Sequence, residues 1–238
     1  MIKEVHTTFK AVREGLAPTE VRKAILEGEL IAKPTFHTRR MVANCIVHRY
    51  LWEGSDWCAE SLAQATAHGP NTPQFLSLAY LYYALRDRLT FEFVTGPVWE
   101  RWRNRSTALT QADLLSFLEK KSEEEPHIRK WRESTRKKVA QSTIVALRDF
   151  GLLHGKHNKQ IQKPSIAPET VFHLLCILVA EGLEGRSVIE APDWRLFLWS
   201  ESEVAQALGE LSQKQWIRFE SSGRTVMLEL LRQPEVIP

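Results

Sequence analysis

The amino-acid sequence predicts a mainly α-helical fold with a smaller C-terminal module that is winged-helix-like and ends in a β-hairpin. Three observations lead to this prediction. Apolar residues recur with helical spacing through 1–153, polar residues dominate 154–167, and 168–238 contains helices followed by a pair of strand-like segments. We therefore expect a helical domain over 1–153, a polar hairpin or linker over 154–167, and the winged-helix-like module over 168–238.

Helix start and stop signals place the elements in chain order. The expected helices span approximately 18–28, 35–52, 55–67, 72–87, a segment after Gly96-Pro97 that carries Trp99 and Trp102, 110–121, 134–150, 168–181 and 200–211. The segment 89–93 follows the 72–87 helix. Gly28 suits the end of the first helix, and Thr35 caps the second. This second helix is apolar around most of its circumference, so we expect it to be central. Gly54 closes it, and Ser55 or Asp56 begins the next helix.

A capping box and a long helix follow. Thr110 and Asp113 have the spacing of a capping box, in which each side chain bonds the other residue's backbone N–H. Ser134 or Thr135 is expected to cap the long helix that ends near Gly151. Its apolar residues gather on one side, as a buried stripe: Val139, Ala140, Thr143, Ala146, Leu147 and Phe150.

The last elements are a helix and a hairpin. Ser200 or Ser202 caps the helix. Within 224–230, Val226, Leu228 and Leu230 then alternate with Met227 and Glu229, the period of a half-buried strand. We expect this segment to pair with 216–220 around a turn at Gly223.

The net charge of +3 conceals a strong polarity along the chain. Residues 1–128 are balanced, whereas 129–163 hold 10 Lys and Arg against 2 Asp and Glu, a net charge of +8. Residues 164–238 hold 6 basic and 11 acidic residues, a net charge of −5. Phosphate backbones are a common partner for such a concentrated positive segment, and a solvated helix face is the alternative.

The basic segment supplies the main candidates for nucleic-acid contact. They are Arg129, Lys130, Arg132, Arg136, Lys137, Lys138, Gln141 and Arg148. Lys and Arg would bind phosphates without reading sequence, and Gln141 would hydrogen-bond a base edge in a major groove. Alternatively, Arg136 and Arg148 lie over the core or pair with Asp149 and the acidic run 123–125.

Arg101 and Arg105 form a second basic cluster. Residues four apart share one face of a helix. Trp102 lies between these two arginines in the sequence, and Trp99 lies two residues before Arg101. Aromatic rings beside arginines can stack nucleic-acid bases. The alternative, that the two Trp side chains belong to the core, is the more common arrangement.

A third pair of candidates comes from an internal echo. Residues 38–44 resemble 135–141, because each begins with Thr and two cations and continues to Val-Ala and an amide. Two comparable basic helix starts are indicated, and helix N-termini suit phosphates. Arg39 and Arg40 are therefore also nucleic-acid candidates.

Several classes of function find no support in the sequence. Three widely spaced Cys residues fit a reduced, cytoplasmic protein, and no stretch is apolar enough for a signal peptide or a membrane span. Cys45 and His48, with Cys58, lack the paired spacing of a zinc site, and His154 and His157 fit a solvated loop better. No phosphate-binding loop, dinucleotide fingerprint or carboxylate cluster is present. We expect no catalytic residues, no cofactor, no metal and no small-molecule substrate.

Three stretches carry a resemblance to a known family. They are Phe36-His37-Thr38-Arg39-Arg40 through His48-Arg49-Tyr50-Leu51, the apolar 75–85 helix before Phe91-Glu92-Phe93-Val94, and Ser134-Thr135-Arg136-Lys137 through Leu147-Arg148-Asp149-Phe150-Gly151-Leu152-Leu153. The sequence resembles the BrxA family of the BREX bacteriophage-exclusion operons over roughly residues 10–200, through diffuse helical patterns. The resemblance implies a helical core like that of the antitermination factor NusB, binding of double-stranded DNA, and a role in phage restriction beside other BREX proteins. It supplies no catalytic residues.

Three functions remain open from the sequence. The first is a DNA-binding accessory protein of a phage-defence system. The second is a protein-interaction adaptor, because the acidic C-terminal module would repel phosphates. The third is an RNA-binding protein, by the NusB-like analogy alone.

Overall fold

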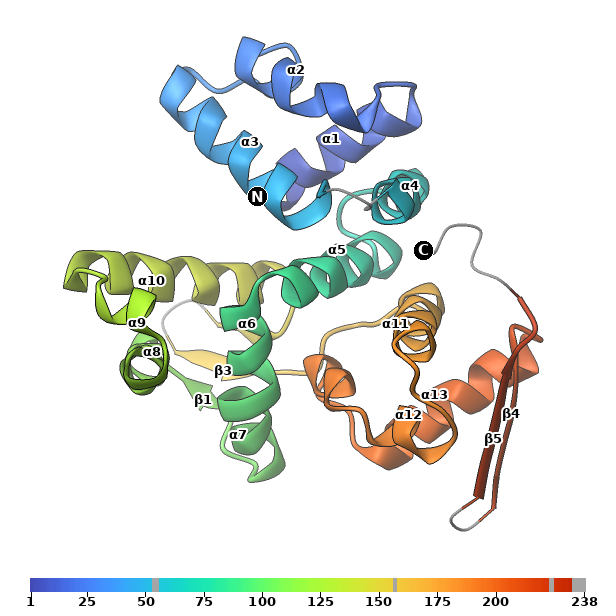
Figure 1. Cartoon of the computed structure of the whole chain (residues 1–238). Helices are drawn as coiled ribbons and strands as arrows, with labels where there is room; N and C mark the ends of the chain where they lie inside the picture. The colour runs from blue at the N-terminus through green and yellow to red at the C-terminus, as the bar shows by residue number, and fades with distance from the viewer. Residues whose placement is uncertain (53–55, 156–157, 223–224, 233–238) are drawn as a thin grey trace. The chain divides into compact units, whose positions relative to one another are not determined.

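The computed structural model describes residues 1–52, 56–155, 158–222 and 225–232, and its secondary structure is mainly helical (Figure 1). The residues group into two compact units. Unit 1 comprises Met1–Asp87, Ile166–Trp194 and Trp199–Pro238, and unit 2 comprises Arg88–Ser165 and Arg195–Leu198. The sequence-based division into 1–153, 154–167 and 168–238 stays a prediction.

Unit 1 contains two runs of helices and the C-terminal hairpin. The elements are α1 (Ile2–Arg13), η1 (Pro18–Glu20), α2 (Val21–Glu27), α3 (Phe36–Tyr50), α4 (Asp56–Ala65), η2 (Thr66–His68), α5 (Pro73–Arg86), α11 (Pro168–Ala180), α12 (Arg186–Glu190), α13 (Glu201–Gln213), β4 (Ile217–Ser222) and β5 (Thr225–Leu230). The short 3-10 helix η4 (Pro192–Phe197) contributes residues to both units. The sequence did not lead us to expect α1 or α12.

The buried centre of unit 1 is α5. Nearly all of its residues from Phe75 to Ala84 are buried, and the helix contacts α3, α4 and α11. The prediction that α3 is central is wrong. Its buried residues are Ala43, Ile46 and Tyr50, while Met41 is 50% exposed. Apolar side chains are spread around α3, but its neighbours cover only one side of it.

Local signals place the helix ends of unit 1 correctly. Gly28 ends α2 with a left-handed φ of 87°, which glycine adopts without strain. Thr35 is the N-cap of α3, and its hydroxyl accepts a hydrogen bond from the Thr38 N–H at 3.2 Å. Ser200 caps α13 in a capping box with Glu203. The predicted Gly54 stop and Ser55 cap lie outside the described residues.

The C-terminal hairpin confirms the alternation read from the sequence. Strands β4 and β5 are antiparallel, with Ile217 opposite Leu230 and Ser222 opposite Thr225. Exposed and half-buried residues alternate along β5. The turn expected at Gly223 lies outside the described residues. The hairpin itself is confirmed, whereas the winged-helix and NusB-like assignments stay predictions.

Unit 2 combines helices with a small sheet. Its elements are α6 (Arg88–Phe93), the π-helical turn η3 (Val94–Val98), α7 (Trp99–Arg103), β1 (Ala108–Leu109), α8 (Gln111–Glu124), α9 (Pro126–Arg129), α10 (Glu133–Asp149), β2 (Leu153–His154) and β3 (Lys159–Ile161). Helix α10 contacts α8 and β2. The rings of Phe93 and Phe117 pack in the core with their centroids 5.3 Å apart.

The long basic helix starts earlier than predicted. Arg132 is the N-cap of α10, and no side chain caps it, so the prediction of a Ser134 or Thr135 cap is wrong. The backbone carbonyl of Arg132 accepts from both Thr135 and Arg136, so the helical bonds begin before the Ser-Thr pair. The predicted buried stripe is largely correct, and Ile144 belongs to it too.

The sheet of unit 2 has the order β1-β3-β2, and both pairings are antiparallel. The sequence left a hairpin or a linker open for the polar segment, and in the structure β2 pairs with β3, Leu153 opposite Ile161 and His154 opposite Gln160. Strand β1 was not predicted, because two residues show no alternation. It pairs Ala108 with Gln160 and brings the start of α8 beside the hairpin.

Candidate nucleic-acid interface

The charges of the chain separate by unit. Unit 2 holds 17 Lys and Arg against 9 Asp and Glu, a net charge of +8, whereas unit 1 holds 15 against 20, a net charge of −5. The basic segment 129–163 lies wholly in unit 2. A single compact body therefore carries the positive field that the sequence predicted.

Four cations of this segment are exposed and unpaired. Arg129 ends α9, Lys130 and Arg132 lie in the connection to α10, and Lys138 lies in the second turn of α10. Within the described part of the segment, the ion pairs all involve other cations. These four charges are available to an external anion, and we call them the free cations.

Lys137 and Arg148 are exposed but have carboxylate neighbours. Lys137 Nζ lies 2.6 Å from Glu133 on the previous turn, and Arg148 Nη2 lies 2.9 Å from Asp149. The hydrogen bonds and charge of Lys137 lower the pKa of the Glu133 carboxyl. Exposed pairs of this kind contribute little to stability, so a phosphate can compete for both cations.

Arg136 is placed differently from its neighbours. Its guanidinium pairs with Glu119 of α8 and lies 3.5 Å from the carbonyl oxygens of Ile128 and Arg129. The side chain is only 18% exposed. This geometry favours the alternative of a structural role, in which Arg136 holds α8 and α9 against α10.

A groove runs beside α10. Its volume is about 540 Å³, and it lies between α10, the start of α8 and strands β1 and β3. The lining residues are Ala108, Leu109, Thr110, Gln111, Gln141, Ile144, Val145, Arg148, Asn158, Lys159 and Gln160. The floor is apolar, and the walls hold two cations and four side-chain amides. Amides both donate and accept hydrogen bonds, which suits base edges and sugars.

Helical spacing sets the wall that α10 contributes. Gln141, Val145 and Arg148 are three or four residues apart, so their exposed side chains follow one side of the helix. The Gln111 side chain donates to the carbonyl oxygen of Lys137 at 3.1 Å. This bond joins α8 to α10 at the edge of the groove.

The wall at the start of α8 depends on Arg101. Thr110 and Asp113 form the predicted capping box, and Arg101 pairs with Asp113 and donates to the Ala108 carbonyl at 3.1 Å. Burial alone would raise the pKa of Asp113, but hydrogen bonds from Thr110 and the charge of Arg101 lower it below its ordinary value. Arg101 therefore supports the groove from within.

The expectation that Arg101 and Arg105 share a helix face is wrong. Helix α7 ends at Arg103, and Arg105 has a left-handed φ of 56°. Arg105 is exposed in the turn before β1. Trp99 and Trp102 are both half-buried, so neither is fully enclosed in the core.

Arg39 and Arg40 belong to unit 1, so the structure does not group them with the free cations. Arg39 donates to the carbonyls of Leu26 at 2.8 Å and Lys33 at 2.9 Å, which ties the loop before α3 to α2. Arg40 is exposed. Their roles in binding stay predictions.

The remaining ionisable groups were predicted neither to hold a metal nor to catalyse a reaction, and catalysis stays a prediction. In the part of the chain that is described, no group of three or more His, Cys, Asp or Glu side chains is arranged to hold a metal ion. Burial raises the pKa of the Cys45 and Cys58 thiols. Every described helix is too short or too polar to cross a bilayer. His157 lies outside the described residues.

Comparison with known proteins gives two findings. The model of a family described as BrxA matches residues 1–176, about three-quarters of the chain. A curated protein named "BREX protein BrxA" from Bacillus cereus (strain H3081.97) is 32% identical over 101 residues, which are 41% of this chain and 50% of the relative. The chain thus spans about half the length of this relative. The family match includes the free cations and the groove beside α10.

Proposed function

Since the chain belongs to the BrxA family, which includes proteins of BREX systems, we propose that it is a non-catalytic accessory protein of phage defence that binds double-stranded DNA in the cytoplasm. The observation that carries the proposal is the set of free cations (Arg129, Lys130, Arg132 and Lys138), exposed on a unit with a net charge of +8. Other BREX proteins are proposed partners.

The dimensions of the basic surface suit a duplex backbone. Arg132 and Arg148 are 16 residues apart along α10, which corresponds to about 24 Å of helix. At about 3.4 Å per base step, this length covers roughly seven steps of a duplex. Phosphate contacts would hold the chain on DNA, and Gln141 and the other groove amides would meet base edges or sugars.

A charge-matched pair of variants tests the assignment. The first variant combines Lys130→Gln, Arg132→Gln and Lys138→Gln. The control combines Lys3→Gln, Arg13→Gln and Lys23→Gln, three exposed cations of unit 1. Both variants lose three positive charges, so any difference reports position and not net charge.

The measurement is anisotropy of a labelled 20-base-pair duplex at several salt concentrations. Each phosphate contact contributes about 0.9 to the slope of log affinity against log salt, so the first variant should lose about 2.7 from that slope. The control should keep the slope of the unmodified chain. Equal slopes for the two variants would contradict the proposal.

RNA binding is separated by competition. Unlabelled duplex DNA, single-stranded DNA and duplex RNA of one length compete for the labelled duplex at fixed salt. The proposal expects duplex DNA to compete best. Stronger competition by either RNA or a single strand would favour a different nucleic-acid function.

A protein-interaction adaptor is the second candidate function. It is favoured by the net charge of −5 on unit 1 and by the acidic residues of α13, since like charge repels phosphate. Glu201 pairs with Arg186 at 3.1 Å, and Glu203 and Glu210 line a hollow between α11 and α13.

A further inference from the structure

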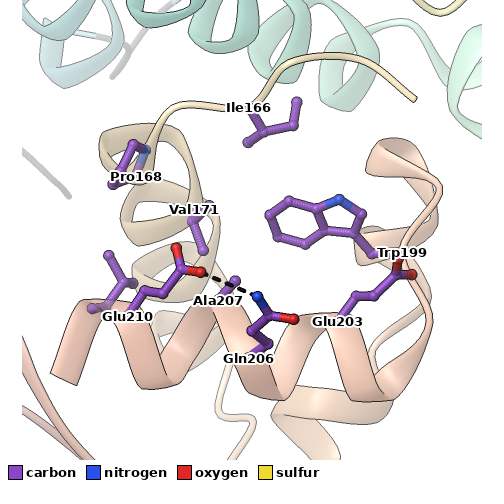
Figure 2. A pocket seen from close by; sticks show the side chains of 9 residues that line it. Ile166, Pro168, Val171, Trp199, Glu203, Gln206, Ala207 and Glu210 are labelled. Carbon is purple, nitrogen blue, oxygen red and sulfur yellow. Dashed lines mark hydrogen bonds between the residues drawn. The ribbon is translucent and has the colours of Figure 1, made fainter. Parts of the chain in front are cut away.

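A small groove lies between α11 and α13 in unit 1. Figure 2 shows Ile166, Val171 and Trp199 around it, with Glu203, Gln206 and Glu210 in a row along α13. Val171 and Leu211 form a buried apolar floor. The volume is about 220 Å³, below the size of typical small-molecule pockets. This groove suits one or two side chains better than a cofactor.

The rim of the groove is acidic. Glu203 and Glu210 are seven residues apart, two turns of one helix face, with Gln206 between them. The Gln206 amide donates to Glu210 at 3.3 Å (Figure 2). Glu203 accepts from the backbone N–H of Ser200 at 2.8 Å and from the Ser200 hydroxyl at 2.9 Å. No Lys or Arg is found among the described residues that line the groove.

Trp199 is held in place as one wall. Its ring stacks on Trp194, with the planes 12° apart and the centroids separated by 6.3 Å. Trp194 is 1% exposed and donates to the Val188 carbonyl at 2.7 Å, so the stack is anchored in the core. A fixed, half-buried indole attracts cations and apolar groups at once.

We propose that this groove docks a segment of a partner protein in which an apolar side chain is flanked by two Lys or Arg residues. The apolar side chain would rest on Val171 and Leu211, and the two cations would pair with Glu203 and Glu210. These carboxylates are separated by about 10 Å of helix. Alternate residues of an extended segment face one side, so cations four apart would be about 13 Å apart, within reach of flexible side chains.

The groove and the proposed DNA interface belong to different units. The α13 residues of the groove lie beyond the residues 1–176 that match the family, and the groove belongs to unit 1. Charge complementarity is what selects the occupant. An acidic rim with an apolar floor disfavours nucleic acid and favours a basic, partly apolar peptide.

The test uses the full chain and three labelled peptides with one frame: Gly-Ser-X-Ser-Leu-Ser-X-Ser-Gly, where both X residues are Lys, Gln or Glu. Anisotropy at low salt should show the Lys peptide binding at least five-fold more tightly than the Gln peptide, with the Glu peptide weakest. Equal binding of the Lys and Gln peptides would overturn the proposal, because the groove would then select an apolar ligand only.

Three variants locate the binding. Glu210→Gln should weaken the Lys peptide about three-fold, and Ala207→Trp, which fills the groove, should weaken it at least ten-fold. Glu220→Gln removes the same charge from the exposed face of β4 and should change nothing. Equal effects of E210Q and E220Q would overturn the proposal. If A207W fails to fold, as judged by thermal unfolding, the Glu variants and the peptide series still decide.

Two further measurements separate peptide docking from self-association and from DNA binding. Sedimentation should show the same oligomeric state for the unmodified chain and for E210Q. Self-association of the unmodified chain that E210Q abolishes would overturn the proposal, because a second copy would then occupy the groove. Duplex DNA affinity should be the same for E210Q and E220Q. Failure of DNA binding in the unmodified chain would leave the peptide result standing, so the two proposals fail separately.

Discussion

Replacing His173 with Asn should remove a pH-dependent loss of stability from the folded chain. His173 lies on α11, and its Nδ1 is 3.0 Å from the Tyr82 hydroxyl of α5. The Nδ1 of the neutral ring can accept a hydrogen bond from this hydroxyl, whereas a protonated ring cannot. Burial at this helix contact lowers the pKa of His173 from 6.5 to about 4.

The size of the effect follows from the two pKa values. Between pH 6.5 and about 4, the unfolded chain binds a proton that the folded ring refuses, so the free energy of unfolding decreases as the pH falls. Each pH unit in this window costs about 1.4 kcal/mol. Lowering the pH from 8 to 5 should therefore decrease the free energy of unfolding by roughly 2 kcal/mol through His173 alone.

Urea unfolding of the unmodified chain, His173→Asn and His37→Asn at pH 8 and pH 5 measures this difference. His37 is exposed at the start of α3, so its variant should keep the pH dependence of the unmodified chain. H173N should have a lower free energy of unfolding than the unmodified chain at both pH values. The decrease in this free energy from pH 8 to pH 5 should be about 2 kcal/mol smaller in H173N than in the unmodified chain. An unchanged difference in H173N would refute the reasoning, because another group would then be responsible.

Two further predictions concern local structure. Thr110→Ala removes the hydroxyl that caps α8 and should lower the free energy of unfolding by about 1 kcal/mol, whereas Ser116→Ala, at an exposed position within α8, should not. Thermal unfolding compares them, and equal destabilisation would contradict the capping role. Arg39→Gln loses two charge-assisted bonds to carbonyls and should cost roughly 1–3 kcal/mol, whereas the exposed neighbour Arg40→Gln should cost little. Chemical denaturation separates the pair, and similar losses would show that Arg39 does not hold the loop before α3.

Much of the fold and of the candidate interface followed from the sequence, because the signals involved are local. The N-caps at Thr35, Thr110 and Ser200 act through side chains on backbone groups three residues away, so a short segment contains all that is needed. The charge of segment 129–163 is likewise a sum over neighbours in sequence. The amphipathic stripe of α10 then predicted which side of that segment faces outward.

Other features depended on contacts between distant segments. The sequence alone could not show that Arg136 would meet Glu119 of α8 while Lys138 stayed free, because carboxylates far along the chain compete for each cation. Helix α5, and not α3, became the centre of unit 1 because neighbours surround it. The groove beside α10 exists because Ala108 pairs with Gln160, a backbone pairing that side-chain periodicity does not encode. Local chemistry thus determined where elements begin and how charged they are, whereas tertiary packing decided which charges and hollows remain open to a partner.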